Sequence, residues 1–169
     1  GGIQAMGYNS DTGILYAVTN DSPARLVLVG TGTAGSTAGF RRVGTVTISG
    51  ISPATFIGGW IYSGNIYVFT SDSPPKLVKI STSTFTQVGT TLTLPTSTSY
   101  LSGLAHDNAG NGYAATGDGR LFRLDLSGTS PTVAVDTTTN LSLQNHGLCV
   151  DTANSRLIGI SVSTNARTE

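Results

Sequence analysis

Residues 8–19, YNSDTGILYAVT, decide the fold of this chain. They contain the end of a short apolar segment, a polar turn with Gly13, and an apolar strand that carries Tyr16. The same design returns as WIYSGNIYVFT (60–70), HDNAGNGYAAT (106–116) and VDTANSRLIGIS (150–161). One residue in the apolar strand marks the same position in each copy, and we call it the anchor residue. The anchors are separated by 51, 46 and 45 residues along the series Tyr16, Tyr67, Tyr113 and Ile158. A period of about 40 to 50 residues is typical of stacked or radially arranged β-units.

Each repeat is expected to hold short strands bounded by turns rich in Gly, Pro, Asn, Asp and Ser. The strands expected in the first three repeats are 3–9, 14–19, 25–30 and 41–48; 55–62, 66–70, 76–80 and 85–94; and 101–107, 112–116, 120–126 and 132–136. The fourth repeat is expected to hold only 146–151 and 156–161. We therefore expect about three and a half repeats in a single domain over residues 1–169, incomplete or completed by a neighbouring chain. Because the chain begins at Gly1 rather than Met, we expect a processed product or a fragment.

The composition favours an all-β protein with an almost uncharged surface. The 169 residues include nine basic and nine acidic ones, and only 11% are charged, against roughly 25% in ordinary soluble domains. Ser and Thr, 19 and 26 in number, take the place of charge, and β-branched residues are abundant. Such a surface suits a protein that self-associates or carries glycans. No basic stripe indicates nucleic-acid binding, and no apolar run is long enough to span a membrane.

Three stretches carry a family resemblance: 5–19 followed by 25–30, 56–70 followed by 76–90, and 103–116 followed by 119–128. In each, a hairpin of the type "GYN, turn, LYAVT" precedes a strand such as RLVLVG or GRLFRLDLSG. Together they resemble an uncharacterised family of propeller-like repeat domains in secreted and cell-surface proteins. The resemblance implies an all-β, propeller-like fold and an extracellular or cell-surface location. It implies no catalytic residues, because the family has no established activity.

The two histidines and the single cysteine are the first candidates for chemistry. His106 shares its repeat position with Tyr8, and His146 begins the next equivalent strand, so a packing role is favoured over catalysis. Cys149 aligns with Gly7 and is expected to be a small buried residue. No C-x-x-C, H-x-x-x-H or G-x-S-x-G motif is present. We therefore expect no metal, no cofactor and no enzymatic activity.

Asn9, Asp107 and Asp151 occupy one repeat position, immediately before the first hairpin turn. Side chains of this type at such a position commonly bond to the turn backbone. The alternative is a Ca²⁺ loop, for example at 107–111, but that segment lacks the dense set of acidic ligands of known calcium loops. A structural role in the turn is favoured.

Aromatic residues and glycosylation sequons are the remaining candidates. Trp60, Tyr62 and Tyr100 are candidates for a sugar-stacking platform, although aromatics at repeat positions more often form the core. N-x-[ST] sequons place candidate N-glycosylation sites at Asn20 and Asn140, both in expected loops.

The sequence thus predicts an extracellular structural or surface protein that self-assembles, of the filament or appendage-subunit kind. The expected partner is a second copy of the chain, joined through open sheet edges. A carbohydrate-binding, lectin-like propeller module is the alternative, with glycans as partners. A hydrolase or lyase on a propeller scaffold is a third reading, and the sequence offers no carboxylate pair to carry it.

Overall fold

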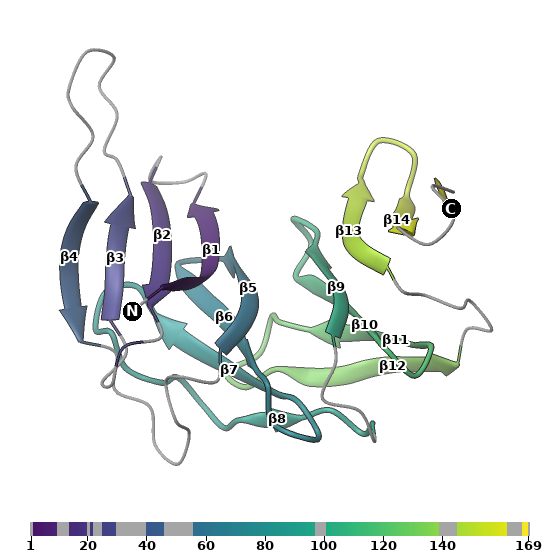
Figure 1. The fold of residues 1–169 in the computed structure, drawn as a ribbon, viewed down its shortest axis with the longest axis horizontal. Helices are drawn as coiled ribbons and strands as arrows, with labels where there is room; N and C mark the ends of the chain where they lie inside the picture. The colour runs from purple at the N-terminus through teal and green to yellow at the C-terminus, as the bar shows by residue number, and fades with distance from the viewer. Residues whose placement is uncertain are drawn as a thin grey trace. The chain divides into compact units, whose positions relative to one another are not determined.

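The computed structural model describes residues 2–9, 14–19, 21, 25–29, 40–45, 56–96, 101–138, 145–161 and 167–168. All regular structure in these segments is β-strand, arranged as successive antiparallel sheets (Figure 1). No helix among them is long and apolar enough to cross a membrane. The all-β prediction is confirmed, and so is the repetition of four-stranded antiparallel sheets.

Strands follow one another across each sheet in sequence order. The first repeat contains β1 (Ile3–Asn9), β2 (Ile14–Thr19), β3 (Arg25–Val29) and β4 (Phe40–Thr45). The second contains β5 (Phe56–Tyr62), β6 (Asn65–Thr70), β7 (Lys76–Ser81) and β8 (Leu92–Thr93). The third contains β9 (Leu101–His106), β10 (Asn111–Thr116), β11 (Arg120–Asp125) and β12 (Thr132–Thr138). The fourth contains β13 (Asn145–Asp151), β14 (Arg156–Ser161) and β15 (Arg167–Thr168).

The register confirms that the four repeats align as the sequence suggested. The anchors Tyr16, Tyr67, Tyr113 and Ile158 all lie in second strands, opposite Gly7, Trp60, Ala105 and Cys149 of the first strands. Each first strand also shows a register shift at one repeat position, next to the small residues Ala5, Gly58, Gly103 and Gly147. A bulge of this kind bends a strand and increases its twist.

Two expectations about strands are wrong. The segment 85–94 does not form one strand: it contains an isolated bridge between Ile80 and Gln87, and then the short β8. The reason is a tight turn, in which Phe85 has φ of 60° and its amide donates to the carbonyl of Ser81 at 3.0 Å. Extended strands require negative φ.

The fourth repeat also departs from expectation, because it holds three strands rather than two. β15 pairs with β14 through Gly159–Thr168 and Ile160–Arg167. A strand of two polar residues produces no alternating pattern in the sequence, so its pairing was not predictable from periodicity.

The chain divides into two compact units, Gly1–Thr70 with Val78–Thr90, and Ser71–Leu77 with Thr91–Glu169. The first unit has a core of apolar side chains from its two sheets: Ala5, Tyr16, Val18, Leu26, Phe56, Ile61, Ile66, Val68, Val78 and Ile80. In the second unit Phe122, Leu124 and Leu126 alternate with exposed Arg123 and Asp125, so β11 buries one face.

Within each unit, the first strand of one repeat packs closely on the first strand of the next. A Cβ atom added to Gly7 of β1 would lie 2.7 Å from both the Cγ1 and the backbone N of Ile61 in β5. A Cβ atom added to Gly103 of β9 would lie 2.8 Å from Cγ of Leu148 in β13. Real Cβ atoms do not approach so closely, so these glycines permit the contact between neighbouring sheets.

Candidate functional site

Asp107 organises the first hairpin turn of the third repeat. Its Oδ1 accepts hydrogen bonds from the backbone N–H groups of Ala109 at 2.9 Å and Asn111 at 2.8 Å. Its Oδ2 accepts from Nδ2 of Asn111 at 2.7 Å and from the hydroxyl of Tyr113 at 3.4 Å. The turn interpretation of Asp107 is therefore confirmed, because its oxygens are engaged by the turn itself.

Burial and hydrogen bonding act in opposite directions on this carboxyl group. Partial burial raises the pKa of Asp107, but the hydrogen bonds from Asn111, Ala109 and Tyr113 more than offset it. The pKa of Asp107 therefore lies below its ordinary value, and the group is a carboxylate at neutral pH. Burial raises the pKa of Tyr113, and the nearby charge of Asp107 adds to the effect, so the phenol keeps its proton.

The equivalent residue of the fourth repeat, Asp151, also bonds to its own turn. It accepts hydrogen bonds from the N–H of Asn154 at 3.3 Å and from its Nδ2 at 2.8 Å. Asn9 is buried. In the described part of the chain, no three His, Cys, Asp or Glu residues gather in a way that would hold a metal ion.

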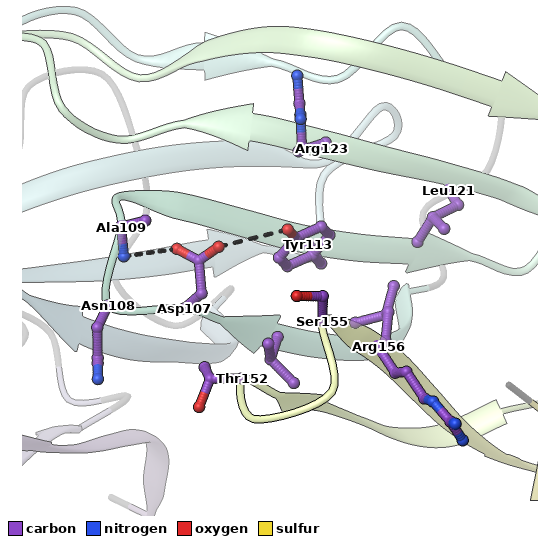
Figure 2. Close-up of a pocket in the computed structure, with 11 residues that line it drawn as sticks. Asp107, Asn108, Ala109, Tyr113, Leu121, Arg123, Thr152, Ser155 and Arg156 are labelled. Carbon is purple, nitrogen blue, oxygen red and sulfur yellow. Dashed lines mark hydrogen bonds between the residues drawn. The ribbon is translucent and has the colours of Figure 1, made fainter.

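A pocket of about 780 Å³ lies beside the Asp107 turn, within the second compact unit. Its walls come from the turn between β9 and β10, from β10 and β11, and from the hairpin of β13 and β14, and Figure 2 shows Thr152 and Ser155 on the turn opposite Asp107 and Tyr113. The lining is mixed: Asp107, Asn108, Ala109, Tyr113, Leu121, Arg123, Val150, Thr152, Ser155, Arg156 and Leu157. The volume suits a small organic ligand, which such a pocket would hold by hydroxyl and guanidinium donors over an aliphatic floor.

Strand β1 has two faces: we call the face that packs against β5 its receiving face and the opposite face its inserting face, and we use the same names for the equivalent faces of the other first strands. In β1 the receiving face is formed by Ala5, Gly7 and Asn9, and the inserting face by Met6 and Tyr8. Ala5 and Asn9 are buried at 4% and 5% exposure, because β5 packs against their face. Met6 and Tyr8 are 54% and 61% exposed.

The fourth repeat shows the opposite situation. The receiving face of β13 consists of Gly147, Cys149 and Asp151, and nothing lies within 4 Å of a Cβ atom added to Gly147. Its inserting face, with Leu148 and Val150, is half-buried. Among the described residues, the inserting face of β1 and the receiving face of β13 are therefore not packed against another first strand.

The histidines and the cysteine have mixed outcomes. The expectation that Cys149 is buried is wrong: it is exposed, and no strand in the described part of the chain covers the receiving face of β13. His106 is half-buried, and its Nδ1 lies 3.2 Å from the carbonyl oxygen of Asp107. The side chain of His146 lies outside the described residues, although its backbone belongs to β13.

The aromatic candidates do not form a sugar platform around Trp60. Trp60 is 5% exposed and packs between Tyr67, at a ring distance of 6.2 Å, and Phe69, at 5.5 Å. A buried indole offers no face for a sugar, so the stacking role is corrected to a core role. Tyr62 is half-buried, and Tyr100 lies outside the described residues. The sequon residues Asn20 and Asn140 also lie outside them, and their glycosylation stays a prediction.

Sequence reasoning missed two features. The first is a second-turn motif in which a buried Thr donates to an Asp two residues later: Thr19 to Asp21 at 3.0 Å, and Thr116 to Asp118. The segments TNDSP, TSDSP and TGDG carried that signal. The second is the pocket, whose residues share no motif because they come from two repeats.

Comparison with family models decides the relationship. Residues 3–165 match a family described as a repeat of unknown function (DUF6923). The chain belongs to this family. The match agrees with the resemblance to an uncharacterised repeat family drawn from the repeated stretches. No protein in a search of curated proteins matches the chain significantly.

Solved structures show a similar fold at low sequence identity. Apo AztD from Citrobacter koseri is 13% identical, with a TM-score of 0.58 over 99% of this chain and 46% of that chain. A chain of a nidogen–laminin complex is 14% identical, with a TM-score of 0.59 over 94% and 56%. A chain of a mitotic checkpoint complex is 9% identical, with a TM-score of 0.60 over 93% and 44%. These matches confirm the propeller-like fold, and this chain spans about half the length of the structures it matches.

Proposed function

We propose that this protein is an extracellular structural or surface protein that self-assembles through the ends of its repeat series. The uncovered inserting face of β1 carries the proposal. Met6 and Tyr8 are 54% and 61% exposed, on the strand face that in the second and fourth repeats lies against another sheet. Apolar side chains on the first strand of a repeat are expected to be covered by a neighbouring sheet.

The energy available from covering this face is large enough to matter. Full burial of a large apolar side chain contributes about 1.5 to 3 kcal/mol, and roughly half of that remains for each of Met6 and Tyr8. Together they supply about 1.5 to 3 kcal/mol, which corresponds to roughly 10- to 150-fold in affinity. A chain in which only 11% of the residues are charged opposes such a contact little.

A head-to-tail contact between identical subunits closes into a ring when its rotation permits, and otherwise extends into a filament.

Association of purified protein tests the proposal. Sedimentation velocity and negative-stain electron microscopy are expected to show oligomers, rings or filaments at high concentration. The double variant Met6→Thr with Tyr8→Thr keeps β-propensity but removes apolar area, and it is expected to weaken association by about 10-fold or more. Val135→Thr is the matched control, because Val135 is 38% exposed on β12, away from the first strands. A wild-type protein that stays monomeric would exclude the proposal.

The extracellular part of the proposal has a separate test. N-linked glycans at Asn20 and Asn140 are expected on protein from its natural source, since both belong to N-x-[ST] sequons. Intact mass before and after glycosidase treatment measures them. A secreted or surface-exposed fraction in the natural source supports the location, whereas recovery only from the cell interior contradicts it.

The pocket beside Asp107 favours a second candidate, a carbohydrate-binding module. Tyr113, Arg123 and Ser155 bring hydroxyl and guanidinium groups to a pocket of about 780 Å³. Glycan-array binding that is lost in Arg123→Ala and kept in Arg25→Ala, an arginine of the other compact unit, would support it. Absence of binding across the array would remove this candidate.

A further inference from the structure

We infer that the partner of the inserting face of β1 is the receiving face of β13 on a second copy of this chain. This inference rests on the proposed self-assembly and specifies the two surfaces that meet. The open inserting face holds Met6 and Tyr8, and the open receiving face holds Gly147 and Cys149.

The chain already makes this contact twice within itself. In the first compact unit, the receiving face of β1 takes the inserting face of β5, where Gly7 meets Ile61. In the second unit, the receiving face of β9 takes the inserting face of β13, where Gly103 meets Leu148. In both contacts a glycine faces a branched aliphatic residue, so the two first strands pack closely against each other.

Both contacts also have the same register. By repeat alignment, Gly103 corresponds to Ala5, and Leu148 corresponds to Met6. Ile61 likewise corresponds to Tyr8. A residue at one position of a receiving face therefore meets the next position of the neighbouring inserting face. Applied to the two open faces, this register places Gly147 against Met6 of the second copy, and Cys149 against its Tyr8.

The exposure of the residues agrees with this pairing. Position by position, Ala105 on the covered receiving face of β9 is 8% exposed, whereas Cys149 on the open face of β13 is exposed. Ile61 on the covered inserting face of β5 is 3% exposed, whereas Tyr8 is 61% exposed. Among the described residues, no first strand packs against either of these two faces. A strand of this same repeat is the surface that matches both faces.

A single substitution to cysteine allows the predicted register to be tested by disulfide formation between two copies. The chain has one cysteine, so Tyr8→Cys creates the pair Cys149 and position 8, which the register places opposite each other between copies. A disulfide needs Cβ atoms about 3.5 to 4.5 Å apart. At Gly7 a Cβ atom would lie 2.7 Å from Cγ1 of Ile61, so neighbouring first strands pack closely enough for a disulfide between them. Diamide is the oxidant, and it takes up the two thiol protons and two electrons. Val135→Cys is the matched control, since it adds an exposed cysteine on β12.

In Tyr8→Cys we expect disulfide-linked oligomers that form at least about tenfold faster than in Val135→Cys, because the thiols react within a formed complex. Peptide mapping is expected to identify the link between positions 8 and 149, and adding Cys149→Ser is expected to abolish it. Two results would overturn the inferred pairing while the proposed self-assembly stands. In both, the wild-type protein forms oligomers; in the first, Tyr8→Cys forms no link between positions 8 and 149, and in the second, Tyr8→Cys and Val135→Cys form disulfide-linked oligomers at equal rates. Wild-type protein that is monomeric throughout would overturn both.

Discussion

The packing of successive first strands predicts that two glycines at one repeat position respond oppositely to the same substitution. Gly103 in β9 and Gly147 in β13 are equivalent by register. Gly103 faces the next sheet, whereas the space beside Gly147 is open. We expect Gly103→Ala to destabilise the monomer and Gly147→Ala to stabilise it.

The magnitude follows from the distances. A Cβ atom at position 103 would lie 2.8 Å from Cγ of Leu148 and 3.3 Å from the backbone of residues 147 and 148. Overpacking of this kind typically costs about 1 to 3 kcal/mol. Replacing Gly by Ala in a strand returns about 0.5 to 1 kcal/mol by restricting the unfolded chain. The net change is a loss of about 1 kcal/mol for Gly103→Ala and a gain of about 0.5 to 1 kcal/mol for Gly147→Ala.

Urea unfolding of dilute protein, followed by far-UV circular dichroism, measures both variants. Their free energies of unfolding are expected to differ by about 2 kcal/mol, or about 4 to 8 °C in Tm for a chain of this size. Equal effects of the two substitutions would refute the argument that the receiving face of β9 is covered and that of β13 is open. Gly147→Ala is further expected to weaken self-association, because its methyl group would meet Met6 of the second copy.

Three further predictions concern the packing of Gly7, the burial of Trp60 and the hydrogen bonds of Asp107. Gly7→Ala is expected to lose about 2 to 3 kcal/mol in urea unfolding, more than Gly103→Ala, because its Cβ meets the backbone N of Ile61, which cannot rotate away; a smaller loss would contradict this. Trp60→Ala is expected to cost about 3 to 5 kcal/mol, as for a core residue, whereas a change below about 0.5 kcal/mol would indicate a surface role. Asp107→Ala is expected to cost about 1 to 2 kcal/mol at neutral pH. Because folding lowers the pKa of Asp107, its contribution is present above the unfolded pKa and is lost as the pH falls through the folded pKa, so the difference from wild type should shrink in acid; a pH-independent difference would contradict this.

Much of the fold could be predicted from the sequence because each repeat carries its own turn chemistry. The strands 3–9, 14–19 and 156–161 have the expected bounds, since alternating apolar runs between Gly, Asn and Asp turns leave little freedom in register. The turn role of Asp107 is likewise predictable from the sequence, because a carboxylate immediately before a hairpin turn bonds to the backbone N–H groups of that turn.

The rest depends on contacts between repeats, which periodicity does not record. Cys149 was expected to be buried because its equivalents are small, yet its exposure depends on whether a neighbouring strand is present. Trp60 was a candidate for sugar stacking, yet Tyr67 and Phe69 of the adjacent strand enclose it. The pocket combines side chains from two repeats, so no local sequence motif predicts it.

The most direct test of the central claim is the molar mass of the wild-type protein in sedimentation equilibrium, from micromolar to millimolar concentration. Self-assembly through the open faces of β1 and β13 predicts a mass that rises with concentration above the 17.3 kDa of one chain and is restored toward 17.3 kDa by Met6→Thr with Tyr8→Thr. A single species of 17.3 kDa at every concentration would contradict the account.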